Sequence, residues 1–351
     1  MKKKLLSVLM AAVMVVGVGS VGATQVKADD EKILGAGIYS ASDNFNSYIG
    51  KAITNACDGI FKTNIEDGQN DQSTQNNQVD TMLAKGASAV AVSVCDVTAA
   101  PTLIQKCKDA GNVPIIFFNK EITDYDVINS YENAYQVTST GGDYGASIQA
   151  QMVIDYWKEH PEMDKNGDGK LQLVYLMGDP GHTASQPRCD YLKSTIEDAG
   201  IEIDLLAEDT GMWVTATAKE KMDAWVSKYG DEIECCVAGN DAMALGALSA
   251  VEAAGFNTDG EENGKYIPIY GIDALPEILS KIESGEITGS VLQDAKTQGQ
   301  TIVKMAENLT NGKDAMDGIE GVEMEEEAKA VRVPYQAITK DNLDLAKSTY
   351  E

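Results

Sequence analysis

The chain has 351 residues, enough for two or three domains, and 43% of them are apolar, so it can bury sizeable cores and is not a disordered protein. Asp and Glu number 55 against 28 Lys and Arg, giving a formal net charge of -27, which excludes a nucleic-acid-binding protein with a basic surface. Aromatic residues make up only 6%, so a site that stacks a ligand on rings has few candidates to draw on.

The first 28 residues predict export. Met1 is followed by three lysines, residues 5–22 are nearly all apolar or small, and Val26-Lys27-Ala28 is typical of a cleavage site. A retained membrane anchor is the alternative, but the glycines and the cleavage signal favour removal of residues 1–28 as a signal peptide. No Cys follows the apolar run, so lipid attachment is not indicated there. We expect a soluble mature protein in the periplasm or at the extracytoplasmic cell surface.

The six cysteines form no CxxC motif, although an exported chain could carry disulfides. Several lie inside apolar runs, and the adjacent Cys235 and Cys236 would point to opposite faces of a strand. We therefore interpret the cysteines as small buried thiols.

Short apolar runs typical of strands alternate with longer helical patterns. The expected strands cover residues 33–40, 89–96, 113–120, 171–178, 203–209, 234–241, 267–273 and 287–294. Segments between them, such as 74–86, 100–111, 217–230 and 241–255, have apolar residues three and four apart and end on Gly. This order predicts an α/β protein with parallel sheets covered by helices on both faces.

Polar residues follow nearly every expected strand. They are Asp43 and Asn44, Asp96, Asn119, His182, Asp209, Asn240, Asp273, and Gln293 with Asp294. Taken singly, such a residue is more often a turn former or a helix N-cap. Since ligands of open α/β sheets bind at the carboxyl ends of the strands, the whole set predicts a binding face.

Two stretches of βα units, roughly 29–139 and 140–292, indicate two lobes with a cleft between them. The cleft would contain amides, a few carboxylates, His182, Arg188 and the rings of Phe45 and Trp213. This set suits an uncharged sugar, because amides, carboxylates and Arg bond hydroxyls while aromatic rings pack on the C–H faces.

Long blocks of the sequence also resemble the galactose/glucose-binding proteins of bacterial sugar uptake and chemotaxis. The resemblance covers nearly the whole chain after residue 28. Its blocks are IYSASDNF (38–45), NDQSTQNNQVDTMLAKG (70–86), VPIIFFNKE (113–121), DKNGDGKLQLVYLMGDPGH (164–182), MWVTATAKEKMDAWVS (212–227), GNDAMALGAL (239–248), YGIDALPEIL (270–279) and AVRVPYQAITKDNL (330–343).

The resemblance implies a type I periplasmic-binding-protein fold, with two Rossmann-like lobes joined by three crossover segments. The N-terminal lobe would comprise residues 29–139 and 293–330, and the C-terminal lobe 140–292 and 331–351. It further implies that Asp43 and Asn119 of the first lobe bond sugar hydroxyls, that Phe45 and Trp213 sandwich the pyranose ring, and that the second lobe contributes His182, Arg188, Asn240 and Asp273.

The sequence departs from the family at two positions of this site. Ala184 stands where the family has an Asp, and Gln293 stands where it has an Asn. A buried hydroxyl left without its partner costs about 1 to 3 kcal/mol unless water replaces the partner. We therefore expect a hexose, because both rings are present, but the two departures leave its identity open.

Residues 164–172 have the spacing of a calcium loop. Asp164, Asn166, Asp168 and Gln172 occupy positions 1, 3, 5 and 9, and the backbone carbonyl of Lys170 occupies position 7. Position 12 is Tyr175 instead of a bidentate Glu, so the segment is no ordinary EF-hand. A solvated turn rich in Asp, Asn and Gly is the alternative.

In the resembled family, a Glu just before the strand that ends in Asn-Asp completes the coordination, and this residue is Glu234 here. We expect Ca²⁺ in a structural role, because an oxygen-filled shell leaves no open position for chemistry.

The leading hypothesis is a monomeric, non-enzymatic sugar receptor that closes on its ligand and is read by an ABC permease or a chemoreceptor. A secreted glycoside hydrolase using Asp43 and Asp273 as paired carboxylates is the alternative from another class. A sugar-responsive repressor would begin with a DNA-binding headpiece, whereas this chain begins with an export signal.

Overall fold

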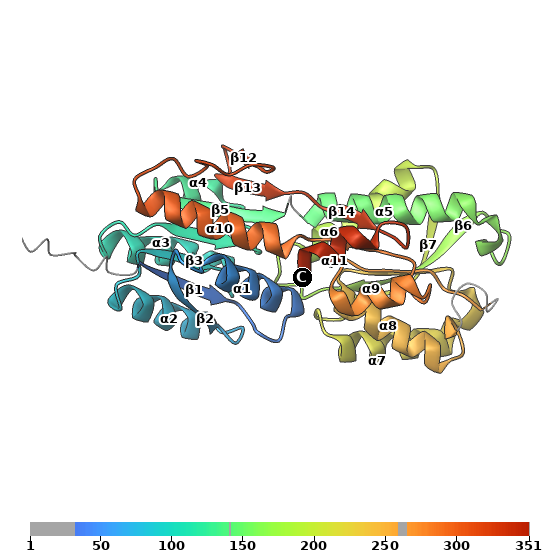
Figure 1. The fold of residues 1–351 in the computed structure, drawn as a ribbon. Helices are drawn as coiled ribbons and strands as arrows, with labels where there is room; N and C mark the ends of the chain where they lie inside the picture. Colours follow the sequence, from blue (N-terminus) through green and yellow to red (C-terminus); the bar gives the residue numbers. More distant parts are fainter. Residues whose placement is uncertain (1–31, 140–141, 259–264, 351) are drawn as a thin grey trace, which may run out of the picture. The chain divides into compact units, whose positions relative to one another are not determined.

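A computed structural model describes residues 32–139, 142–258 and 265–350 of the chain. The predicted signal peptide, residues 1–28, lies outside the described residues. Within them, parallel strands alternate with helices, which confirms the predicted α/β class (Figure 1). None of the described helices has the length and apolar character that a membrane crossing requires.

The first sheet has seven strands within the described residues, and its five central strands are parallel neighbours. In spatial order the strands are β12 (Glu323–Glu325), β13 (Ala330–Val333), β5 (Ala134–Ser139), β4 (Ile115–Phe118), β3 (Ala89–Val92), β1 (Ile33–Ile38) and β2 (Lys62–Asp67).

Side chains of these strands alternate between two hydrophobic clusters, as the pleat of a strand requires. Ile116 and Phe118 belong to the cluster under α1 (Asn44–Ala56) and α10 (Ala295–Thr310). Ile115 and Phe117 belong to the cluster on the other face, under α2 (Gln72–Ala84), α3 (Ala100–Asp109) and α4 (Tyr125–Asn129). The sheet is therefore covered by helices on both faces, and the ends of its strands stay available for a site.

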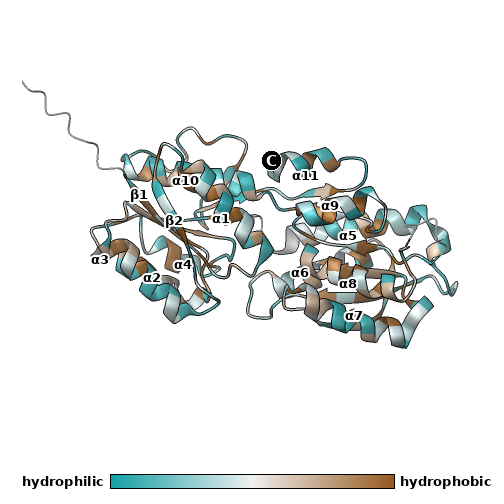
Figure 2. Ribbon diagram, turned by 60° about the horizontal axis from the view of Figure 1, so that its bottom comes forward, coloured by the Kyte–Doolittle hydropathy of each residue, from teal (hydrophilic) through white to brown (hydrophobic). Residues whose placement is uncertain are grey.

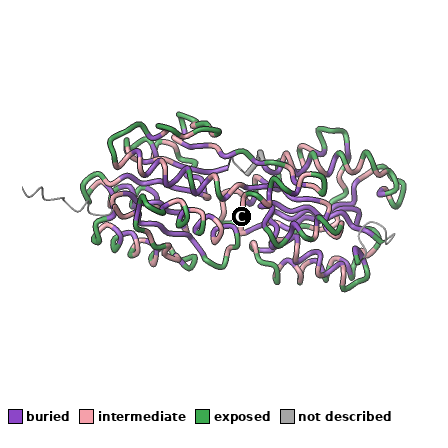
Figure 3. The backbone as a smooth tube through the Cα atoms, in the orientation of Figure 1, coloured by how far each residue is buried: buried purple, intermediate pink, exposed green. Residues whose placement is uncertain are grey.

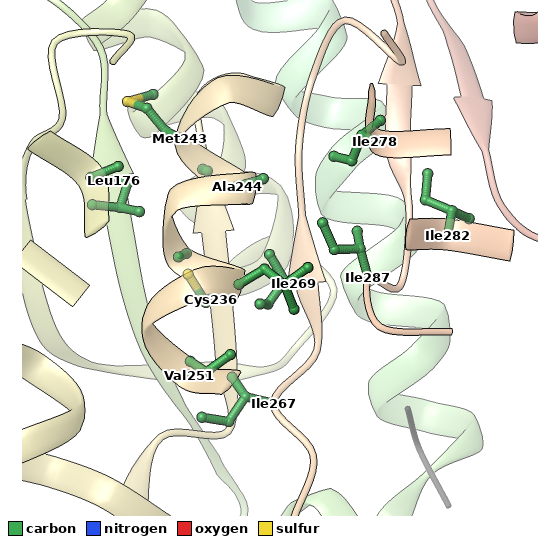
Figure 4. Close-up of a cluster of buried hydrophobic side chains, with 14 of the residues drawn as sticks. Leu176, Cys236, Met243, Ala244, Val251, Ile267, Ile269, Ile278, Ile282 and Ile287 are labelled. Carbon is green, nitrogen blue, oxygen red and sulfur yellow. The ribbon is translucent and has the colours of Figure 1, made fainter. Parts of the chain in front are cut away.

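The second sheet is parallel and has the order β10 (Ile269–Tyr270), β8 (Cys235–Ala238), β6 (Lys170–Met177) and β7 (Glu202–Thr210). Cys236 lies in the cluster drawn in Figure 4, under α7 (Thr215–Tyr229), α8 (Asp241–Ala253) and α9 (Pro276–Glu283). Cys235 lies on the other face with α5 (Gly142–Glu159) and α6 (Ser185–Asp198), as the alternation predicted. Figures 2 and 3 show the apolar, buried strands between helices whose outer surfaces are polar and exposed.

A two-stranded antiparallel ribbon follows the second sheet in the chain and is formed by β11 (Ser290–Leu292) and β14 (Gln336–Ile338). The last helix is α11 (Leu343–Tyr350), and short 3₁₀ turns lie at Val97–Ala99, Pro161–Met163 and Gly230–Glu232. We retain the division into lobes at 139/140, 292/293 and 330/331 as a proposal. Since β13 pairs with β5 through Val333, sheet membership favours a last crossover a few residues later.

All six cysteines are free thiols, and five of them are buried. Burial raises the pKa of Cys57 and Cys95 to about 11 and that of Cys107 to about 12. Thiols with such pKa values carry almost no thiolate at neutral pH, so they act as small core side chains.

Candidate functional site

The carboxyl ends of strands from both sheets surround one small cavity. All nine residues predicted to bind the ligand line it, together with Tyr39: Asp43, Phe45, Asn119, His182, Arg188, Trp213, Asn240, Asp273 and Gln293. The cavity has a volume of about 20 Å³, room for roughly one water. The lining side chains therefore contact one another in this arrangement; His182 Nε2 lies 3.4 Å from Asn119 Oδ1.

Two of the lining residues also cap helices. Asp43 Oδ1 accepts the backbone N–H of Asn46 at 2.8 Å at the start of α1, and Asn240 Oδ1 accepts that of Met243 at 3.0 Å at the start of α8. An N-cap fixes its side chain against the first helical turn. The remaining polar atoms of Asp43 and Asn240 are thus held at the cavity by rigid helix starts.

Trp213 owes its position to two glycines. A Cβ on Gly178 would lie 2.0 Å from Cζ2 of the indole ring, and a Cβ on Gly239 would lie 3.2 Å from Cζ3. The backbone at Met212 and Trp213 has φ of 55° and 63°, a conformation that non-glycine residues rarely adopt and that often marks functional segments. The ring also meets His182 edge to face, with centroids 5.4 Å apart.

Arg188 is a buried cation that ties several elements together. It donates to Gly239 O at 2.6 Å, to Gln293 Oε1 at 3.1 Å and to the Tyr335 hydroxyl at 3.2 Å. Its Nε is buried without a hydrogen-bond partner among the described residues. The guanidinium therefore retains a donor for an additional acceptor in the cavity.

Asp273 supplies a second buried ionisable group. Its φ is 122° and that of Ala274 is 50°, so two consecutive residues have left-handed backbone. Asp241, fully buried beneath this turn, accepts Leu275 N at 2.7 Å and the Ser290 hydroxyl at 2.6 Å, which holds the turn in place. Burial, followed by the nearby Asp241 carboxylate, raises the pKa of Asp273 well above its ordinary value.

His182 is kept neutral by its surroundings. Desolvation lowers its pKa well below the ordinary value, and the positive charges of Lys120 and Arg188 act in the same direction. Its Nδ1 accepts the backbone N–H of Ala184 at 3.1 Å, which leaves the proton on Nε2, facing Asn119. The imidazole therefore offers one neutral donor to the cavity.

Sequence reasoning missed Tyr39, which follows β1 directly. Its hydroxyl donates to Asp43 Oδ2 at 2.6 Å, and Lys120 Nζ lies 4.1 Å from the centroid of its ring. Burial, reinforced by Asp43, raises its pKa well above the ordinary value, so the phenol stays protonated. Its place at the end of an apolar strand was the signal that could have identified it.

Four of the polar residues that follow strands lie outside the cavity lining, and they act as helix caps or surface residues. Asp96 caps a 3₁₀ turn, Asp294 caps α10, and Asp209 pairs with Lys221 at 2.6 Å. Asn44 is the exposed first residue of α1. A polar residue after a strand thus predicts the edge of the sheet more reliably than it predicts the site.

The predicted calcium loop is a compact turn. Asp164 accepts the N–H groups of Gly167, Asp168 and Gly169, and Asp168 accepts that of Lys170 at 2.9 Å. Asn166 Oδ1 accepts Asp168 N at 2.9 Å. The side-chain oxygens are therefore gathered on the inside of the turn by the backbone itself.

Glu234 reaches this loop from the start of β8. It is 1% exposed, and its two oxygens accept Lys165 N at 2.6 Å and Gln172 N at 3.0 Å. Gln172 Oε1 is buried without a hydrogen-bond partner among the described residues. Among the described residues, no three or more His, Cys, Asp or Glu side chains lie together in an arrangement that could hold a metal ion.

Known proteins resemble the chain over nearly its full length. It is 41% identical over 340 residues to the D-galactose/methyl-galactoside binding periplasmic protein MglB of Haemophilus influenzae, covering 96% of this chain and 97% of that protein. A solute-binding protein of an ABC transporter from Bacillus halodurans, solved with myo-inositol, matches with a TM-score of 0.72 and 27% identity over 91% of this chain and 98% of that one.

A third protein shows the fold alone. The solute-binding protein from Actinobacillus succinogenes, solved with D-allose, is 18% identical and has a TM-score of 0.72, covering 90% of this chain and 100% of that one. These neighbours confirm the predicted type I periplasmic-binding-protein fold.

Residues 36–314 match the family described as periplasmic binding protein domain. Proteins of this family bind solutes outside the cytoplasm and are not enzymes, which confirms the expected export and overturns the alternative of a hydrolase using Asp43 and Asp273. The chain belongs to the periplasmic binding protein domain family.

Proposed function

We propose that the protein is the sugar receptor of an ABC transport system and binds a hexose such as galactose or glucose. The observation that carries this proposal is the composition of the cavity, in which amide, carboxylate, imidazole and guanidinium groups converge beside the rings of Phe45 and Trp213. These groups match hydroxyls that both donate and accept, while the rings match the C–H faces of a pyranose.

Charge balance in the cavity supports an uncharged ligand. Asp43 and Asp273 oppose Arg188, and Lys120 lies close by. A charged solute would bring a charge without a dedicated partner into this largely buried site, which is strongly unfavourable. The relative from Haemophilus influenzae, named for D-galactose and methyl-galactoside, supports the choice of hexose.

Sugar entry requires motion, because the cavity of about 20 Å³ cannot admit a hexose as it stands. We infer that the lobes separate to admit the sugar and close on it through contacts such as that between Asn119 and His182. The closed surface is then recognised by a membrane ABC permease, and in some settings by a chemoreceptor, with the receptor acting as a monomer.

We further propose that the 164–172 loop binds Ca²⁺ as a structural ion. Asp164, Asn166, Asp168, Gln172, Glu234 and the carbonyl of Lys170 would hold it. The buried, unpartnered Gln172 Oε1 supports this assignment, and Ca²⁺ prefers such all-oxygen sites. Bound calcium supplies charge neutralisation for the carboxylates and links the loop to β8.

Titration calorimetry with galactose, glucose, ribose and xylose, with and without calcium, tests the proposal. We expect the hexoses to bind tightly and the pentoses weakly. Trp213→Ala should weaken hexose binding by about 1 to 3 kcal/mol while the variant remains folded. If none of these sugars binds, or if Trp213→Ala leaves hexose affinity unchanged, the assignment of this cavity is wrong.

A further inference from the structure

A second, larger cavity of about 540 Å³ adjoins the small one. The two share four lining residues, Asn119, His182, Arg188 and Gln293. The two cavities therefore meet at these four side chains, and we call the larger one the side chamber.

One face of α6 forms a wall of the side chamber. Ala184, Pro187, Arg188 and Tyr191 all line it, and their spacing of three and four residues places them along a single stripe. Four other helices, α1, α2, α8 and α10, are capped by an Asp or Asn side chain, but α6 begins at Ala184 with no side-chain cap. At the start of α6, Ala184 therefore contributes only a methyl group to the chamber wall.

The opposite wall carries charges that are already neutralised. Arg332 is bound to Glu121 through two hydrogen bonds of 2.7 and 2.8 Å and to Glu325 at 2.7 Å. Arg332 also donates to the Thr138 hydroxyl at 2.9 Å. Glu121 and Glu325 are balanced by Arg332 together with Arg188, which also lines the chamber, so the side chamber offers hydroxyls and paired charges, and no net charge, to an occupant.

Two groups in the side chamber point to a ligand. Arg188 is 6% exposed, lines both cavities, and has a buried Nε without a partner among the described residues. Tyr191, about 4.5 Å further along the axis of α6, is 47% exposed although its ring lines the chamber. An exposed ring beside polar donors is the arrangement on which the C–H face of a sugar packs.

We propose that the side chamber is a second subsite, which takes a further neutral sugar ring linked to the hexose in the small cavity. The ligand class would then include disaccharides. This inference rests on the proposed function, since the first ring must occupy the site between Phe45 and Trp213.

Calorimetry with two groups of probes tests it: galactose and glucose, then lactose, melibiose, cellobiose and maltose. We expect at least one disaccharide to bind as tightly as its free hexose or more tightly. Tyr191→Ala should lower the ratio of disaccharide to hexose affinity about threefold to tenfold. Thr123→Trp, which adds bulk from an exposed position on the first-lobe side of the chamber, should lower the same ratio.

Leu345→Ala is the matched control, because Leu345 is 48% exposed in α11 and lines neither cavity. The ratio of disaccharide to hexose affinity of this variant should equal that of the wild type. A protein that binds hexoses but no disaccharide overturns the second subsite and leaves the proposed function standing. A protein that binds neither class overturns both, and an unchanged ratio in both chamber variants overturns the subsite even if a disaccharide binds.

Discussion

The indole of Trp213 occupies the space where a side chain of residue 178 would otherwise begin, since a Cβ on Gly178 would lie 2.0 to 2.2 Å from three atoms of the ring. Gly178 follows β6 directly, so the indole ring packs against the backbone at the end of a buried strand. The proposed stacking platform is thus defined by a residue that has no side chain.

Gly178→Ala should therefore displace the ring. We expect hexose affinity to fall by about as much as in Trp213→Ala, with overpacking costing about 1 to 3 kcal/mol of stability. Calorimetry and urea unfolding measure the two effects. Gly181→Ala in the same loop is the control, because its Cβ would approach only Asp179 Oδ1, at 3.3 Å. If Gly178→Ala binds sugar as the wild type does, the ring does not depend on this contact.

Calcium should stabilise the native state. Ligand binding to the folded form alone adds about 2.7 kcal/mol at a concentration one hundred times Kd, so chelation should lower the melting temperature. Asp168→Ala also removes hydrogen bonds to Asn166 and Gln172, so its informative readout is a lost response to added calcium. Asp317→Ala, which removes the partner of Lys313 far along the chain, should respond like the wild type. A wild-type melting curve that ignores both chelator and calcium would refute the metal assignment.

Ala184→Asp should act on stability and on ligand choice. Ala184 has helical φ and ψ of -88° and -12°, so a carboxylate there would stabilise α6 mainly through the helix dipole, by about 0.3 to 1 kcal/mol. Because Ala184 lines the side chamber together with His182 and Arg188, the same group should tighten binding or shift the preference among hexoses. Ala184→Asn is the matched variant, since its side chain has the same shape without the charge. Identical sugar profiles for all three proteins would mean that residue 184 does not face the ligand.

Acid should weaken the fold through His182. Its folded pKa lies well below the unfolded value of about 6.5, so the unfolded chain takes up a proton that the native state refuses. The resulting stability is present above about pH 6.5 and is lost as the pH falls, by at most about 1.4 kcal/mol per pH unit. Urea unfolding at pH 7.5 and 5.0 should show a smaller loss for His182→Gln than for the wild type. Equal losses would show that His182 titrates normally.

The strands that sequence reasoning found are those with apolar runs, and those it missed carry polar side chains for structural reasons. In β5, Gln136 is fully buried because its amide holds Ile122 N at 2.8 Å and Ala328 O at 3.1 Å. β2 lies at the edge of its sheet and has no fully buried residue, so it carries no apolar signal. The spacing of apolar residues predicts only strands that pack on an apolar core. It does not detect strands that are held by hydrogen bonds to distant segments, as β5 is through Gln136.

The nine predicted ligand residues could be found from the sequence because strand ends and helix starts can be recognised locally, and the structure brings these residues together. Tyr39 and the Asp241 clamp escaped, since their roles depend on partners such as Asp43 and Leu275 that only the folded chain brings near. The side chamber escaped for the same reason: it combines α6 with Arg332, which is distant in the sequence.

Asp43 and Asn240 start helices with the same side chains that face the ligand. Replacing either residue would destabilise a helix and also remove a ligand contact. Substitutions at these two positions are therefore poorly tolerated. Ala184 and Gln293 cap nothing. A lineage that adapts to a new nutrient would therefore be free to vary first at those two places, where the resemblance to the galactose/glucose-binding proteins implies that this sequence differs from them.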